Sequence, residues 1–163
     1  MAFALELALY NIRSVHNVGS LFRTAESVGA KAVHLIGYTP APEDRFGRMR
    51  ADMHKSALGA EELVPWHVWK DEEEFFAHMR SEGSRTIAVE QSSESVIYTK
   101  LELFPISHVY ILGNETEGLP ISVIEKADAC IELPMLGKKE SLNVAVAGGI
   151  VLYDARMRWR EMG

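Results

Sequence analysis

At residues 111–120 the chain reads Ile111-Leu112-Gly113-Asn114-Glu115-Thr116-Glu117-Gly118-Leu119-Pro120, an apolar run that passes directly into a turn bounded by glycines. The run begins at His108, and a short apolar run that stops at glycine or a polar turn is typical of a β-strand. The two glycines permit positive φ angles and let the backbone approach a ligand closely. The pattern of residues 108–120 therefore predicts a strand with a ligand-binding loop at its carboxyl end, as in open α/β sheets.

Similar apolar runs recur along the chain and alternate with segments of helical period. We predict strands at residues 5–10, 32–36, 85–90, 108–112 and 129–133, with a weaker one at residues 66–69. This alternation indicates an α/β fold in which a parallel sheet carries helices on both faces. The length of 163 residues fits one ordinary domain, so we expect a single domain over residues 1–163.

Three segments have the pattern of helices. Residues 17–29 place an apolar stripe on one side, with Asn17 as a candidate N-cap and Gly29 as a stop. Residues 71–80 open with four acidic residues, which suit the positive end of a helix dipole. Residues 141–161 read as a long helix that is apolar on most sides at first, so we expect it to be deeply packed or at an oligomer interface.

The segment at residues 38–58 differs in kind from the rest of the chain. Two prolines and a glycine interrupt any long period, and the segment also carries five basic residues: Arg45, Arg48, Arg50, His54 and Lys55. We expect a functional loop that holds no more than one short helix.

The composition excludes several classes of protein. The formal net charge of −6 argues against a broad basic surface that coats nucleic acid, although it leaves room for a local basic patch. The lone Cys130 can form no internal disulfide, and residues 3–9 lack the basic start of a signal peptide. The apolar run at residues 144–153 is too short to span a bilayer. We therefore expect a cytoplasmic protein without a membrane segment.

Several familiar motifs can be rejected. Gly113 and Gly118 have the spacing of a phosphate-binding loop, but Leu119 and Pro120 stand where a Lys-Ser/Thr pair is needed. The chain has no G-x-G-x-x-G sequence, which weakens a dinucleotide-binding interpretation. The histidines show neither H-x-x-x-H spacing nor a cysteine partner, so we predict no metal site. The glycosylation sequon at residues 114–116 is a chance match in a chain without a secretory signal.

Three segments at predicted strand ends are rich in polar and small residues: 11–23, 113–118 and 133–143. Taken singly, each has an ordinary structural explanation. Arg23 suits a surface ion pair, Glu115 suits a solvated turn, and Ser141 and Asn143 suit helix capping, with Asn143 in the first turn. Spacing alone leaves these alternatives open.

Together the three segments resemble the motifs of the SpoU (TrmH-like) family of RNA ribose 2′-O-methyltransferases, within the SPOUT class. Residues 17–24 are similar to the family's N-x-x-x-x-x-R-T, and residues 113–119 to its G-N-E-x-x-G-L. Residues 133–147 are similar to I-P-M-x-G…S-L-N-V-A-x-A, with Leu133 in place of the commoner Ile. The resemblance runs from about residue 9 to residue 153 and includes residues 55–60.

The resemblance implies a SPOUT-type fold with a C-terminal trefoil knot, a homodimer, and S-adenosylmethionine bound in the knot. The substrate would be tRNA or rRNA, and no metal is required. It implies catalytic roles for Asn17, Arg23, Glu115, Ser141 and Asn143. It implies donor contacts from Glu90, Leu112, Gly113, Leu133, Met135, Ser141 and Leu142. Arg23 matches the residue assigned to activating the hydroxyl, but a guanidinium is almost never neutral, so stabilisation of an alkoxide or a grip on phosphate remain alternatives.

Basic residues in or beside the motifs and the 38–58 segment predict a local positive surface for RNA. The candidate RNA contacts are Arg13, Arg23, Arg45, Arg48, Arg50 and Lys55. The acidic run at residues 72–74 lies far from any motif and is expected to face away.

Two other functions remain open at this stage. The first is a non-catalytic RNA-binding or assembly protein that keeps the knotted dimer without turnover. The second is a nucleotide- or NAD-dependent enzyme, although this sequence lacks the glycine-rich phosphate-binding motif that such an enzyme needs. The sequence does not predict which RNA or which nucleotide is the target.

Overall fold

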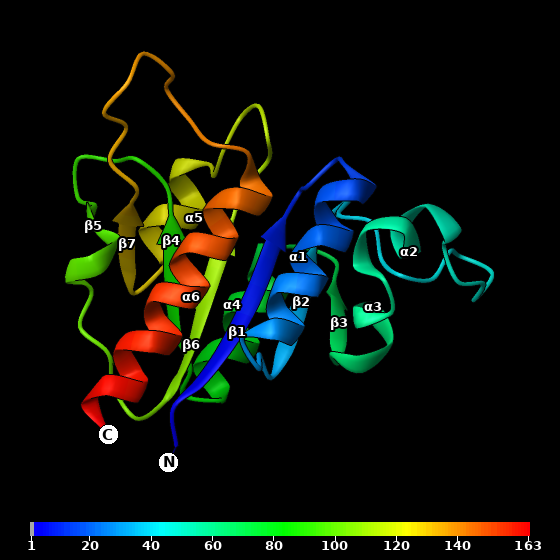
Figure 1. Ribbon diagram of the computed structural model, residues 1–163, viewed down its shortest axis with the longest axis horizontal. Coiled ribbons are helices and arrows are strands. Elements are labelled where there is room, and N and C mark those ends of the chain that lie inside the picture. The colour runs from blue at the N-terminus through cyan, green and yellow to red at the C-terminus, as the bar shows by residue number, and fades with distance from the viewer. Residues whose placement is uncertain (1) are drawn as a thin grey trace.

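The computed structural model describes residues 2–163 and contains one seven-stranded sheet (Figure 1). Its order is β3-β2-β1-β6-β4-β7-β5, and every pairing between these strands is parallel. The strands are β1 (Ala4–Tyr10), β2 (Ala32–Ile36), β3 (Trp66–Trp69), β4 (Arg85–Val89), β5 (Val96–Ile97), β6 (Ser107–Leu112) and β7 (Ala129–Glu132).

Helices cover both faces of the sheet. They are α1 (Val15–Ser27), α2 (Ala51–Ala57), α3 (Ala60–Leu63), α4 (Glu72–Ser81), α5 (Ile121–Lys126) and α6 (Val144–Met162), with a 3₁₀ turn at Tyr98–Lys100. Figure 1 shows α1 and α6 side by side in front of the sheet and α4 and α5 behind it. The predicted α/β architecture, a parallel sheet with helices on both faces, is confirmed.

The core consists of two apolar layers, one on each face. Leu5, Leu7 and Leu9 of β1 point toward α1 and α6, while Ala8 between them joins the layer under α4 and α5. Successive side chains of a strand point to opposite faces, so a strand covered on both sides reads as a nearly continuous apolar run. This is why the strands could be found from the sequence.

A small residue lets α6 lie close to its neighbours. A Cβ atom added at Gly148 would stand 2.5 Å from a methyl carbon of Leu21 in α1 and 2.8 Å from one of Leu112 in β6. Since packed carbons do not approach so closely, glycine is needed at this crossing. The crossing holds the amino end of α6 near the carboxyl end of β6.

Two predicted helix starts are wrong by a few residues. α1 begins at Val15, and its N-cap is Ser14, whose Oγ accepts the N–H of Asn17 at 3.1 Å, so Asn17 lies inside the helix. α6 begins at Val144 because the Asn143 side chain accepts the N–H groups of Ala145 and Val146, which leaves Ser141 outside the helix and Asn143 as its cap.

The sequence also missed some short elements. β5 has two residues, α3 four and α5 six, and such lengths carry too few residues for a periodic pattern. The 38–58 segment holds one short helix, α2, as expected. Within residues 2–163, no helix is long and apolar enough to cross a membrane.

Candidate active site

Three loops meet at the carboxyl edge of the sheet, along the top of Figure 1. They are residues 11–14 after β1, residues 113–120 after β6, and residues 133–143 after β7. Parallel strands end at the same edge, so loops far apart in the sequence come together there. The second and third motifs lie mainly in these loops, and the first, at residues 17–24, lies in α1 directly after the 11–14 loop.

Glu115 and Asn17 tie the motifs together. The carboxylate of Glu115 accepts the backbone N–H groups of Arg13 and Ser14, each at 3.0 Å, although Ser14 is 101 residues away in the sequence. It also accepts a hydrogen bond from the Asn17 amide at 3.2 Å. The Asn17 amide oxygen in turn accepts from the Asn143 side chain at 3.3 Å. One hydrogen-bonded chain therefore links all three motifs.

The environment of Glu115 keeps it ionised. Burial alone would raise the pKa of its carboxyl group, but the N–H groups of Arg13 and Ser14 and the Asn17 amide hold that pKa below its usual value. These donors lie at the amino end of α1, where the helix dipole favours a negative charge. The carboxylate is thus suited to hold the loops together and poorly suited to take up a proton.

Asn114 organises the same turn, a role that was not predicted from the sequence. Its Oδ1 atom accepts the N–H groups of Thr116 and Glu117, both at 2.9 Å. Its amide donates to the Asn11 carbonyl and to the Tyr38 hydroxyl, both at 2.9 Å. The available signal was an Asn between a strand and a glycine-bounded turn, where its side chain replaces backbone partners.

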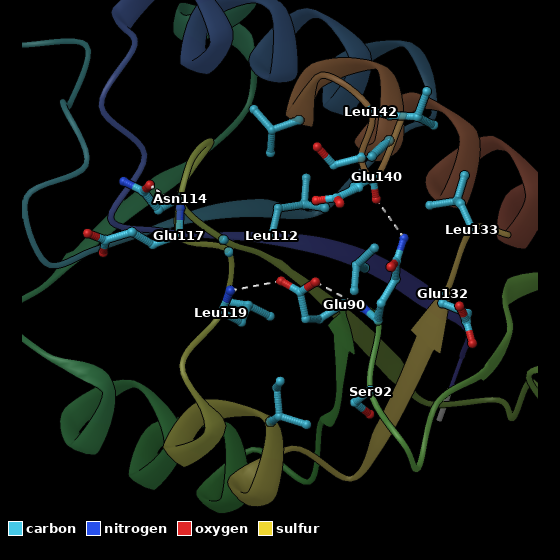
Figure 2. Close-up of a pocket in the computed structure, with 18 of the residues that line it drawn as sticks. Glu90, Ser92, Leu112, Asn114, Glu117, Leu119, Glu132, Leu133, Glu140 and Leu142 are labelled. Atoms are coloured by element: carbon cyan, nitrogen blue, oxygen red, sulfur yellow. Dashed lines mark hydrogen bonds between the residues drawn. The ribbon is translucent and has the colours of Figure 1, made fainter. Parts of the chain in front are cut away.

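A cavity of about 750 Å³ opens beside this network, between the loops after β4, β6 and β7 (Figure 2). Every residue for which the resemblance implies a donor contact lines it: Glu90, Leu112, Gly113, Leu133, Met135, Ser141 and Leu142. The size is in the usual range for small-molecule sites. The four apolar side chains in this set supply a wall suited to a flat aromatic group.

Glycines shape the wall formed by residues 113–119. A Cβ atom on Gly113 would stand 2.5 Å from the carbonyl carbon of Gly118 and 2.6 Å from the nitrogen of Leu119. Gly118 has a φ of +67°, and a Cβ there would stand 2.2 Å from the carboxylate of Glu90. That carboxylate accepts the N–H of Leu119 at 2.9 Å (Figure 2). A side chain at Gly113 would collide with backbone, and one at Gly118 would strain the backbone and displace the Glu90 carboxylate.

The cavity has an unusual charge. Seven carboxylate residues line it: Glu90, Glu94, Glu115, Glu117, Glu125, Glu132 and Glu140. The lining contains no Lys, Arg or His residue. A pocket lined by one sign of charge concentrates ligands of the opposite sign. This cavity therefore favours a cationic ligand and disfavours a phosphate-bearing one.

Some predicted catalytic residues lie outside the cavity. Glu115 and Ser141 line it, whereas Asn17, Arg23 and Asn143 do not. Asn17 reaches its border through its hydrogen bond to Glu115, and Asn143 is linked to that border only through Asn17. Arg23 is exposed on α1, and the structure gives its side chain no ion-pair or hydrogen-bond partner among residues 2–163. The ordinary explanation of Arg23 as a surface ion-pairing residue therefore finds no support within that range.

The predicted RNA contacts form no part of the cavity. Arg13, Arg45 and Lys55 are exposed. Arg48 pairs with Asp44 at 2.9 Å and Arg50 with Asp52 at 3.1 Å, and exposed pairs of this kind are weak. Across the described part of the chain, no group of three or more His, Cys, Asp or Glu residues is arranged to hold a metal ion.

Comparison with known proteins identifies relatives that span nearly the whole chain. The chain is 33% identical over 152 residues to the 23S rRNA (guanosine-2′-O-)-methyltransferase of Neisseria meningitidis serogroup B, which covers 93% of this chain and 58% of that protein. It is 28% identical over 159 residues to the tRNA (guanosine(18)-2′-O)-methyltransferase of Escherichia coli, covering 98% and 66%. The chain thus spans between half and two thirds of the length of these relatives.

A solved structure and a family profile agree with these relatives. The AdoMet-bound rRNA methyltransferase from Sinorhizobium meliloti superimposes with a TM-score of 0.87 at 29% identity, covering 95% of this chain and 56% of that one. The profile of the SpoU rRNA Methylase family matches residues 4–153, which include all three motifs and every strand. The chain belongs to the SpoU rRNA Methylase family.

Proposed function

We propose that this chain is an S-adenosylmethionine-dependent RNA methyltransferase that methylates a ribose 2′-hydroxyl of tRNA or rRNA. The observation that carries the proposal is the acidic, partly apolar cavity built from the second and third motifs and joined to the first through Glu115. The relatives and the AdoMet-bound neighbour described above support the same activity.

The charge of the cavity favours this donor over a nucleotide. S-adenosylmethionine carries a sulfonium and an ammonium group against one carboxylate, so its net charge is positive. NAD carries a doubly charged pyrophosphate and nucleoside triphosphates carry more negative charge, which seven lining carboxylates would repel. Two independent observations therefore argue against a nucleotide-dependent enzyme. The sequence lacks the phosphate-binding motifs, and the lining of the cavity is acidic.

The residues present fit each part of the donor. Leu112, Leu133, Met135 and Leu142 offer an apolar surface for the adenine ring. Glu90 accepts the N–H groups of Gln91 and Leu119, and a carboxylate has acceptor sites left for ribose hydroxyls. Gly113 lets the backbone approach the ligand directly. When bound, the donor supplies a methyl group activated by its positive sulfur.

This chain's own residues would orient the acceptor and stabilise charge. Methyl transfer requires the 2′-oxygen to be in line with the methyl carbon, so positioning accounts for much of the rate. Glu115, Asn17 and Asn143 hold the loops in register and serve as positioning groups. Arg23, with its guanidinium free in the described structure, is assigned to the RNA side, where it stabilises the developing alkoxide or grips a phosphate.

A homodimer is part of the proposal. Val146, Tyr153 and Met157 leave a row of exposed apolar side chains along α6, at spacings of seven and four residues that keep them on one side. Arg23 lies outside the cavity of its own protomer, and a second copy packed on this surface offers a way to complete the site.

The trefoil knot and a cytoplasmic location also belong to the proposal. The free, buried Cys130 suits a reducing compartment.

The test is incubation of the protein with methyl-labelled S-adenosylmethionine and unmodified RNA, followed by mapping of 2′-O-methylribose. Label in ribose on a tRNA or rRNA is the expected result, and the mapped position identifies the target. Weak donor binding by calorimetry, together with RNA binding and no label on any RNA, would instead support the non-catalytic RNA-binding alternative. Absence of donor binding would contradict both the cofactor and the enzyme.

A further inference from the structure

The exposed side chain of Phe46 stands among arginines at the tip of the segment that joins β2 to α2. Its exposed fraction is 66%, and in Figure 1 this segment extends beyond α2, away from the sheet. A single exposed aromatic residue is common on protein surfaces. What distinguishes Phe46 is the structure that holds it and the charges around it.

The tip is a tight, internally bonded turn. Asp44 accepts the N–H groups of Phe46 at 2.8 Å and Arg48 at 3.0 Å through one carboxylate oxygen, and the Arg48 side chain at 2.9 Å through the other. The backbone of Asp44 also pairs with Arg48 at 2.8 Å and with Gly47 at 2.9 Å. Gly47 has a φ of +76°, which the turn requires. The backbone at Phe46 is therefore fixed before any partner binds.

Two guanidinium groups lie over the ring. The central guanidinium carbon of Arg45 lies 4.8 Å from the centre of the Phe46 ring, and that of Arg48 lies 5.0 Å away. Nucleobases stack both on aromatic rings and on guanidinium planes, and arginine also binds the adjoining phosphates. The combination matches one nucleotide of a polynucleotide strand, with its base on the ring and its backbone on the arginines.

We propose that Phe46 is a stacking platform for an unpaired nucleobase of the RNA substrate. This inference rests on the proposed function and adds a requirement to it. Bases inside a duplex already stack on each other, so the substrate must offer a loop, bulge or single strand to this turn. The turn contributes no residue to the lining of the cavity, so the platform is a contact additional to the donor site.

The test compares Phe46→Leu, which removes the aromatic ring but keeps apolar bulk, with Phe46→Tyr, which keeps the ring. The probes are a single-stranded RNA carrying 2-aminopurine and a duplex of the same sequence. We expect Phe46→Leu to weaken single-strand binding about five- to a hundredfold and to reduce quenching of the fluorescent base. The slope of log affinity against log salt should not change, since no phosphate contact is lost.

Phe104→Leu is a matched control. Phe104 is 37% exposed, and the guanidinium carbon of Arg85 lies 4.9 Å from the centre of its ring. It therefore offers a similar pair of aromatic ring and guanidinium, but just before β6, at the amino ends of the strands. We expect its RNA affinity to equal that of the unaltered protein.

Equal affinity of Phe46→Leu and the unaltered protein would overturn the proposal, as would an equal loss in Phe104→Leu. If in either case the unaltered protein still methylates RNA, the stacking role fails while the proposed function stands. If the unaltered protein neither binds nor methylates RNA, the proposed function itself fails.

Discussion

The cavity and residues 38–50, the part of the 38–58 segment that precedes α2, carry charged side chains of opposite sign. Glutamates line the cavity, and Glu90 and Glu115 are fixed there by backbone N–H groups. The 38–50 segment presents Arg45, Arg48 and Arg50 around a turn held by a single aspartate. On the proposed function, a chain with a net charge of −6 would therefore offer a cationic methyl donor and an anionic RNA separate surfaces. The distribution of charge, rather than the net charge, is what the proposed binding of the two ligands depends on.

Arg23 is the sharpest test of this separation, because it belongs to neither region. We expect Arg23→Ala to lower the turnover rate about a hundred- to a thousandfold if the guanidinium stabilises the alkoxide. Affinity for donor and for RNA should change little. Single-turnover methylation and equilibrium binding measure the two effects. A large loss of RNA affinity with normal turnover at saturating RNA would assign Arg23 to the phosphate grip instead.

Gly113→Ala tests the cavity alone. The added methyl group would collide with the backbone of Gly118 and Leu119, so the loop must shift into the cavity. We expect donor affinity to fall about ten- to a hundredfold, measured by calorimetry, while RNA affinity is kept. Gly137→Ala is the control, since nothing lies within 4 Å of a Cβ at Gly137. Equal effects of the two substitutions would show that the tight 113–119 turn does not shape the donor site.

Replacing Arg45, Arg48 and Arg50 by Gln tests the basic segment alone. Each phosphate contact on a single strand contributes about 0.7 to the slope of log affinity against log salt, so three contacts contribute about 2. We expect the slope to decrease by up to that amount and RNA binding to weaken, while donor affinity stays constant. An unchanged slope would remove this segment from the RNA surface.

The smallest expected effect is a pH dependence of stability that comes from the hydrogen-bonded carboxylate of Glu115. Its folded pKa lies below the usual value of 4.5, so the carboxylate stabilises the fold above that pH, and the contribution disappears as pH falls through the lowered pKa. Because the group is partly exposed, the contribution is at most about 1 kcal/mol. Urea unfolding of Glu115→Gln and the unaltered protein should differ at pH 7 and converge in acid. A difference that persists in acid would assign the effect to packing.

Much of the fold could be predicted because its signal is local. Strands buried on both faces appear as apolar runs, and the β2 bounds of Ala32–Ile36 match the predicted range. The seven candidate donor contacts came from the family resemblance, and the structure brings them together in one cavity, whose other lining residues were not predicted. The role of each in donor binding or catalysis stays a prediction.

The details that could not be predicted depend on partners distant in the sequence. Asn17 was assigned as a helix cap, but Glu115, 98 residues away, takes its amide, and Ser14 caps the helix. The bonds of Asn114 to Asn11 and Tyr38 are of the same kind, at separations of 103 and 76 residues. No pattern within one segment contains that information.

The pairing of β1 with β6 has a consequence for synthesis of the chain. Ala4 lies beside Ser107, and Leu9 beside Leu112, so β1 must wait for a neighbour that is made about a hundred residues later. At bacterial or eukaryotic elongation rates this delay is about 5–20 s. During that time one edge of an apolar seven-residue strand has no partner, and such edges invite association with other chains. The nascent chain is therefore most in need of chaperone cover before β6 emerges, and no binding site can exist until then.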